Sequence, residues 1–120
     1  MIIRNGTRVL IVEDDLVVAR ILSRQFSAEG CVVRSAGSAE DGIRIAGTES
    51  FQLILTDINL PGMSGFEAIG ALKRAGDAPV LVMTGQADAE FAEDARQLGA
   101  IGLIAKPLEF ETLKSFLSGL

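Results

Sequence analysis

The chain has 120 residues, of which 48% are hydrophobic and 22% are charged; this balance fits one compact globular domain and excludes disordered and collagen-like classes. Its 11 basic and 16 acidic residues give a formal net charge of -5, which argues against direct nucleic-acid binding because phosphate contacts need clustered Lys and Arg. The chain has no histidine and one cysteine, so zinc clusters and Ser/His or Cys/His catalysis lack the side chains they need.

The N-terminal segment has the features of neither a signal peptide nor a membrane span. Its apolar run at 9–12 is short and is followed directly by three acids at 13–15, whereas a transmembrane helix needs about 20 apolar residues. We therefore expect a cytoplasmic domain with no membrane contact. In that reducing setting Cys31, which lies in an apolar run, is expected to be a small buried hydrophobe.

Apolar periodicity along the chain predicts five strands that alternate with five helices. Short apolar runs between turn residues predict strands buried on both faces, and apolar spacings of three or four predict helices. Helix-capping residues are expected at Asp15, at Ser38 with Asp41, and at Ser64, and Gly30 is expected to end the first helix. The predicted strands are 7–12, 31–36, 51–56, 80–83 and 101–105, and the predicted helices are 16–29, one opened by Ser38, 64–74, 88–98 and 109–117.

This order predicts a doubly wound α/β fold with a five-stranded parallel sheet, in a single domain of residues 1–120 with no output domain. Parallel crossovers are right-handed, so the carboxyl ends of all five strands share one edge of the sheet. Polar side chains follow four of these ends, and we expect them to converge. They are Glu13 and Asp14, Asp57, Thr84, and Lys106.

Asp57 is the central candidate, because it ends a buried apolar run and precedes a turn with Pro61, and ligands of open α/β sheets bind beyond such strand ends. Crowded carboxylates repel one another, and a hard divalent cation relieves that repulsion. Asp14, Asp57, a backbone carbonyl and waters suit Mg²⁺. Lys106 and Thr84 offer a positive charge and a hydroxyl to phosphoryl oxygens, which leaves Asp57 as the candidate nucleophile that forms an acyl phosphate.

Each of these residues also has an ordinary structural interpretation. The acids at 13–15 can cap a helix, Asp57 can cap the following turn, Thr84 can end a strand, and Lys106 can be a solvated loop lysine. These interpretations do not explain why all of the groups fall on one edge of one sheet.

The segments LIVEDD, DINLPGMSG, MTG and the final KP resemble the motifs of the receiver domains of bacterial two-component response regulators, and the resemblance covers essentially the whole chain. It implies the flavodoxin-like strand order 2-1-3-4-5. It also implies that Asp57 is the phosphorylated aspartate, that Asp14 is a direct Mg²⁺ ligand, and that Glu13 acts on the metal through water. The backbone carbonyl of Asn59 would complete the metal shell, with Mn²⁺ as an alternative ion.

The resemblance further implies how a signal would spread. Thr84 matches a hydroxyl that moves toward the phosphoryl group, Lys106 matches the lysine that pairs with it, and the bond to Pro107 would be cis. The loop from Gly85 to Asp88 and the face of the fourth helix would then change. Leu103 stands where the family usually has Tyr or Phe, so repacking of Leu103 would replace the burial of a ring.

The residues near Leu103 leave one further question open. Ile101 and Leu103 make an apolar partner patch if they are exposed on an edge strand; alternatively, they pack under the last helix.

Three functions remain in competition. The first is a phosphoacceptor switch, not an enzyme beyond its own phosphorylation and dephosphorylation, which accepts from a sensor histidine kinase or a histidine phosphotransfer protein and controls a downstream protein or a missing effector domain. The second is a Mg²⁺-dependent aspartyl-phosphate phosphatase or phosphotransferase, which would be expected to carry a second acid where Asn59 and Leu60 stand. The third is a docking pseudo-receiver that is never phosphorylated; the substitution at Leu103 favours it, and the intact Asp57 and Lys106 argue against it.

Overall fold

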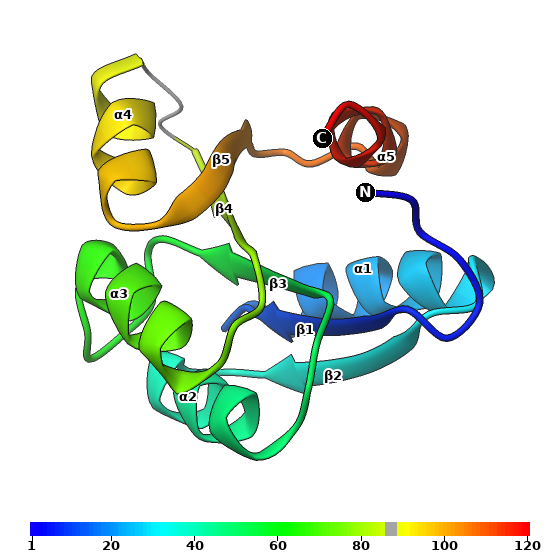
Figure 1. The fold of residues 1–120 in the computed structure, drawn as a ribbon, viewed down its shortest axis with the longest axis horizontal. Coiled ribbons are helices and arrows are strands. Elements are labelled where there is room, and N and C mark those ends of the chain that lie inside the picture. The colour runs from blue at the N-terminus through cyan, green and yellow to red at the C-terminus, as the bar shows by residue number, and fades with distance from the viewer. Residues whose placement is uncertain (86–88) are drawn as a thin grey trace.

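A computed structural model describes residues 1–85 and 89–120 and shows a parallel five-stranded sheet with helices on both faces (Figure 1). The strand order is β2-β1-β3-β4-β5, which confirms the predicted fold class. The strands are β1 (Arg8–Val12), β2 (Val32–Ala36), β3 (Leu53–Asp57), β4 (Val80–Thr84) and β5 (Ala100–Ala105). The helices are α1 (Leu16–Ala28), α2 (Ala39–Thr48), α3 (Gly65–Ala75), α4 (Ala89–Gln97) and α5 (Phe110–Ser118).

The ten elements follow the predicted order, and their ends differ from prediction by about two residues at most, as is usual at fraying ends. The predicted start of the fourth helix at Asp88, and the loop before it, lie outside the described residues. No helix within residues 1–85 and 89–120 is both long and apolar enough to span a bilayer.

Three predicted helix caps are present. The Asp15 carboxylate accepts hydrogen bonds from the backbone N–H groups of Val17 and Val18, at 2.9 and 3.3 Å. The hydroxyls of Ser38 and Ser64 accept from the N–H groups three residues further on. Each cap satisfies a donor that the first helical turn leaves free. The Asp15 cap starts α1 directly after the acids that end β1.

Two apolar cores lie on opposite faces of the sheet (Figure 1). We call them the α1/α5 core and the α2/α3/α4 core after the helices that cover them. Cys31 belongs to the α1/α5 core, where burial raises the pKa of its thiol, as expected for an inert hydrophobe. Leu113 and Leu117 are buried in the same core, and Phe66 is half-buried against the α2/α3/α4 core.

A bulge in β5 corrects both interpretations of its apolar residues. Val80 pairs with Ala100 but Leu81 pairs with Gly102, so one extra residue interrupts the ladder. Ile101 therefore packs toward the α1/α5 core and Leu103 toward the α2/α3/α4 core, and both are half-buried. They form neither one exposed patch nor a pair beneath the last helix.

Two glycines allow close approaches that seat helices on the sheet. A Cβ on Gly42, inside α2, would lie 2.8 Å from Cγ2 of Val12. This glycine, which weakens the helix by itself, thus lets α2 approach β1. A Cβ on Gly65, the first residue of α3, would lie only 2.2 Å from the carbonyl oxygen of Ile58. The start of α3 therefore rests directly on the backbone that follows Asp57.

Candidate functional site

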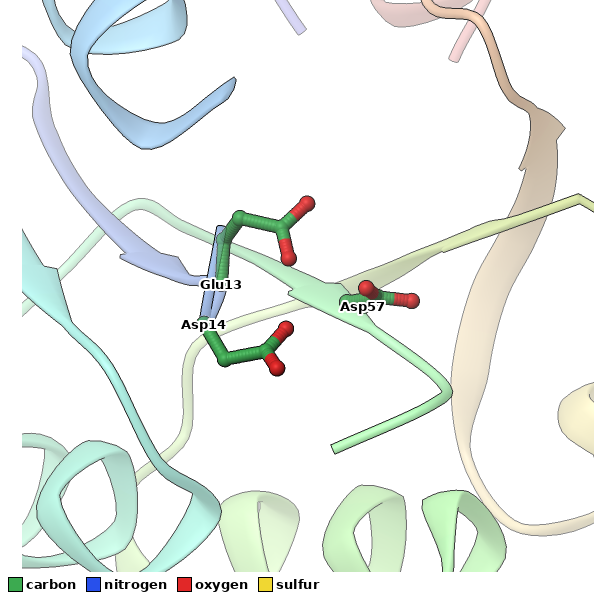
Figure 2. Close-up of side chains that lie close together, drawn as sticks. All are labelled: Glu13, Asp14 and Asp57. Atoms are coloured by element: carbon green, nitrogen blue, oxygen red, sulfur yellow. The ribbon is translucent and has the colours of Figure 1, made fainter. Parts of the chain in front are cut away.

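Three carboxylates meet at the carboxyl edge of the sheet. Glu13 and Asp14 follow β1, and Asp57 is the last residue of β3. These strands are neighbours, and Val12 pairs with Thr56. The next residues, Glu13 and Asp57, therefore lie side by side. One oxygen of each carboxylate lies within 4.8 Å of the others, and Figure 2 shows the three side chains around a common space.

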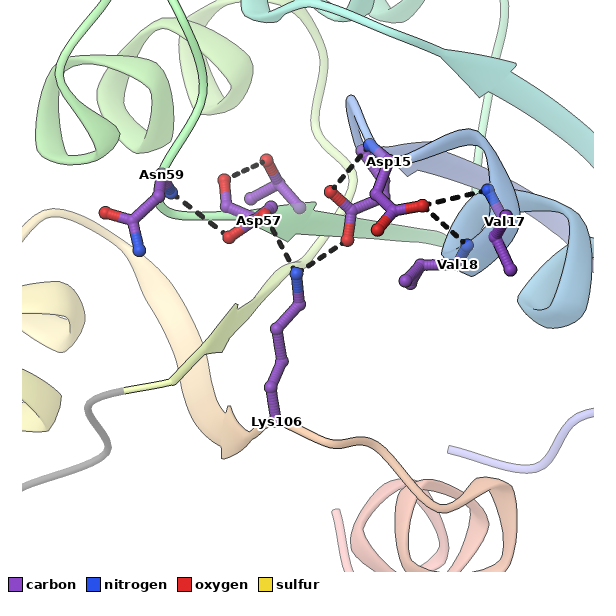
Figure 3. A network of polar contacts seen from close by, with 8 residues as sticks. Asp15, Val17, Val18, Asp57, Asn59 and Lys106 are labelled. Carbon is purple, nitrogen blue, oxygen red and sulfur yellow. Dashed lines mark hydrogen bonds and ion pairs between the residues drawn. The ribbon is translucent and has the colours of Figure 1, made fainter.

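Lys106 reaches this cluster from the end of β5. Its Nζ atom lies 2.7 Å from Oε1 of Glu13 and 2.9 Å from Oδ2 of Asp57. Figure 3 draws the contact between Lys106 and Asp57. The backbone N–H of Lys106 donates to the carbonyl oxygen of Thr84 at 2.8 Å, which holds the end of β5 beside β4. The peptide bond from Lys106 to Pro107 is cis.

Burial strengthens the interactions between the charged groups of this cluster, and the pKa values of Glu13 and Lys106 are shifted. Glu13 is 1% exposed and Asp57 is 6% exposed. Loss of solvent raises the pKa of Glu13 above its ordinary value, and the neighbouring Asp57 adds to that rise, against the lowering effect of the hydrogen bond from Lys106. Burial lowers the pKa of Lys106, but its hydrogen bonds to Glu13 and Asp57 outweigh that effect and raise it. Lys106 is therefore a cation held between two acids.

Backbone groups fix the orientation of the two buried acids. The N–H of Asn59 donates to Oδ1 of Asp57 at 3.1 Å, and the N–H of Asp15 donates to Oε2 of Glu13 at 3.4 Å. Each oxygen of Asp57 thus has its own donor, one from the backbone and one from Lys106. Asp14 is exposed and has no hydrogen-bond or ion-pair partner within residues 1–85 and 89–120.

The structure brings together most, but not all, of the residues singled out in the sequence. Thr84 lies at the end of β4, is 1% exposed, and is joined to Lys106 through its carbonyl oxygen. Leu103 packs against the α2/α3/α4 core instead of joining the acidic cluster. The direct ion pair between Glu13 and Lys106 was missed, because β1 and β5 are not neighbours in the sheet and only the length of the lysine side chain spans the gap.

The donor set fits a hard divalent cation. Three carboxylates share one small volume with a single ammonium group, so negative charge exceeds positive charge there. Asp14 has carboxylate oxygens free for a ligand, and all three acids offer the oxygen ligands that Mg²⁺, Ca²⁺ and Mn²⁺ prefer. A divalent cation would offset the excess negative charge.

Comparison with known proteins agrees with this geometry. The family model of the response regulator receiver domain matches residues 9–118. The response regulator protein FleR of Pseudomonas aeruginosa is 34% identical over 109 residues, which are 90% of this chain and 23% of FleR. A probable chemotaxis protein CheY of Rhizobium etli is 31% identical over 119 residues, which are 96% of this chain and 92% of that protein.

A solved structure is also similar. It is a response regulator protein of Burkholderia pseudomallei with a phosphorylated aspartic acid, a calcium ion and citrate; it is 30% identical, with a TM-score of 0.84, over 95% of this chain and 72% of that one. The chain spans roughly half, or less, of the length of several curated relatives that it matches. Receiver domains bind a divalent metal at an acidic pocket, and this chain has such a cluster in Glu13, Asp14 and Asp57.

The match over residues 9–118, the strand order and the acidic cluster at the carboxyl edge all lead to one conclusion. The chain belongs to the receiver-domain family of two-component response regulators, a family of regulatory domains that are phosphorylated on an aspartate.

Proposed function

We propose that the chain is a phosphoacceptor switch in which Asp57 takes a phosphoryl group from a sensor histidine kinase or a histidine phosphotransfer protein. The observation that carries this proposal is the position of the Asp57 carboxylate. It ends a buried strand, each of its oxygens is held by a different donor, and it lies beside two further acids. A nucleophile held in this way needs little reorganisation before it reacts.

The reaction exchanges one phosphorus bond for another. An oxygen of Asp57 forms a bond to phosphorus while the bond from phosphorus to the donor's histidine nitrogen breaks, and that nitrogen keeps the electron pair. Lys106, now paired with two carboxylates, would turn its charge to a phosphoryl oxygen, and the Thr84 hydroxyl would donate to another. Positioning and charge neutralisation supply most of the catalysis that such a transfer needs.

Mg²⁺, when bound, would neutralise charge between the acids and the incoming phosphoryl oxygens. Asp14, Asp57 and the backbone carbonyl of Asn59 would hold it directly and Glu13 through water, and Mn²⁺ would be a substitute. These residues follow neighbouring strands, and the acids are within reach of one another.

Beside the site, α1 offers a surface for a protein donor. Leu16, Val17 and Ile21 are 68%, 66% and 51% exposed, which is unusual for such large apolar side chains. A cavity of about 230 Å³ is lined by Ile21 of this surface and by the segment 106–108. Lys106 belongs both to this cavity and to the acidic cluster, so a protein docked here would lie next to Asp57.

Ile21→Asp is expected to slow phosphoryl transfer from a phosphorylated histidine phosphotransfer protein by about tenfold or more, because it places a charge in an apolar contact. Transfer from acetyl phosphate, which needs no docking, should be unchanged. The matched control is Leu98→Asp, an equally drastic change at an exposed residue beyond the end of α4. Equal slowing by both variants, or slowing with acetyl phosphate, would contradict the docking role.

The experiment that tests the function is intact mass spectrometry of the chain after incubation with acetyl phosphate. We expect one added phosphoryl group with Mg²⁺ and none when a chelator removes the metal. Continuous release of phosphate without an adduct would favour a phosphatase or phosphotransferase instead. No adduct with either acetyl phosphate or a phosphorylated histidine protein would favour a pseudo-receiver that only docks partners.

In this proposal residues 1–120 act as one receiver domain in the cytoplasm, the reducing compartment that an unpaired buried cysteine fits. Cell fractionation would check that location. Phosphorylation would change the loop after Thr84, of which residues 86–88 lie outside the described part, and the exposed face of α4. That change would control a downstream protein or an effector domain.

A further inference from the structure

The helix α4 is held by few apolar side chains. Phe91 is the one large apolar residue in its sequence, AEFAEDARQ, and Ala95 is fully buried beneath it. The Phe91 ring is half-buried against the α2/α3/α4 core and lies 5.0 Å from the ring of Phe66, at an interplanar angle of 43°. Because few large apolar side chains hold α4, this ring pair helps to fix its position.

Phe66 is in the first turn of α3, and that turn contacts the backbone next to Asp57. Phe66 follows Gly65, whose Cα is so close to Ile58 that an added Cβ would lie 2.2 Å from the Ile58 carbonyl oxygen. Ile58 is the residue after Asp57, and its N–H donates to the carbonyl oxygen of Met83 at 3.1 Å. The first turn of α3 is therefore in direct contact with the backbone next to Asp57, and a shift of that backbone would act on it.

The space around the ring pair allows movement. A cavity of about 300 Å³ lies between α3 and the end of α4, lined by Phe66, Gly70 and Arg74 on one side and by Leu98 on the other. Leu103, which replaces the family's usual aromatic residue, packs against the same core as both rings. The Phe66 ring therefore borders open space into which it can move.

We propose that phosphorylation of Asp57 is transmitted to α4 through α3, with the contact between Phe66 and Phe91 as the coupling element. This inference rests on the proposed function, since it requires Asp57 to be phosphorylated. It differs from transmission along the loop between β4 and α4 in a testable way, because it makes the response of α4 depend on a side chain in α3.

The chain carries six phenylalanines and neither tryptophan nor tyrosine, so uniform labelling with 4-fluorophenylalanine gives a simple ¹⁹F spectrum that Phe→Leu variants assign. Acetyl phosphate and Mg²⁺ phosphorylate the labelled protein, and intact mass gives the phosphorylated fraction in each sample. We expect the Phe66 and Phe91 resonances to shift. The Phe26 and Phe110 rings, a second pair at 5.1 Å on the opposite face of the sheet, should shift much less.

The decisive variant is Phe66→Leu, with Phe66→Met as a second version in case the first fails to fold. Either variant should still be phosphorylated, and the Phe91 resonance should lose most of its phosphorylation-dependent shift. Phe110→Leu, which also removes a half-buried ring from an aromatic pair, should leave the Phe91 shift intact. A full Phe91 shift in the Phe66 variants would overturn the inference. A wild-type protein that gains no mass adduct from either acetyl phosphate or a phosphorylated histidine protein would instead refute the proposed function, and this inference with it.

Discussion

Asp57→Asn is expected to abolish phosphorylation by acetyl phosphate or by a histidine donor completely. The amide has nearly the shape of the carboxylate but lacks the anionic oxygen that would attack phosphorus. The fold should survive, because the variant removes one of three crowded negative charges while its amide oxygen can still accept from Lys106 or the N–H of Asn59. Intact mass spectrometry measures the adduct, and urea denaturation checks that the variant is at least as stable as the wild type.

Asp15→Asn is the matched control for this variant. It is the same chemical change two residues from Glu13, and the Asn side chain can still cap α1 through its amide oxygen. It should be phosphorylated like the wild type. If Asp57→Asn still gained a phosphoryl group, the acceptor would have to be another acid, and the assignment of Asp57 would be wrong.

Gly65→Ala is expected to destabilise the protein by about 3 kcal/mol, the range of severe overpacking at a rigid site. The new Cβ would lie 2.2 Å from both the carbonyl oxygen and Cγ1 of Ile58, so the backbone has to move and not only a side chain. Urea denaturation monitored by circular dichroism gives the free energy of unfolding. Because the displaced backbone adjoins Asp57, slower phosphorylation should accompany the loss of stability.

Gly37→Ala is the control, since an added Cβ there meets nothing within 4 Å and the backbone angle is one that alanine accepts. Its effect should lie within about 0.5 kcal/mol of zero, or be slightly stabilising, because alanine restricts the unfolded chain. A loss at Gly65 no larger than the change at Gly37 would mean that α3 is not seated on Ile58 as described.

The sequence predicts the fold well because β1, β3 and β4 are buried on both faces, whereas the edge strand β2 is largely exposed. Runs such as 53–55 and 80–83 are apolar throughout, and helical spacing with caps at Asp15, Ser38 and Ser64 places the helices between them. The strand order came from the family resemblance, because periodicity does not say which strands are neighbours. The bulge in β5 was missed, since one inserted residue leaves no mark in so short an apolar run.

The sequence predicts which strand end carries each residue of the candidate site. Glu13, Asp14, Asp57, Thr84 and Lys106 could be placed on one edge because parallel strands share their direction. The contacts within the cluster were not predictable, because they depend on side-chain length and on register: Lys106 reaches across two strands to Glu13. The half-buried position of Phe66 likewise depends on where α4 lies, which the sequence of α3 does not contain.

The single buried thiol has a practical consequence. Cys31 belongs to the α1/α5 core, so a thiol reagent can modify it only in molecules where that core has opened. Under conditions in which the core recloses faster than the reagent reacts, the modification rate, divided by that of the same thiol in unfolded protein, gives the equilibrium constant for opening. Cys31 thus reports the opening of the α1/α5 core in the native state. This core lies on the sheet face opposite α4, and its opening can be compared before and after phosphorylation.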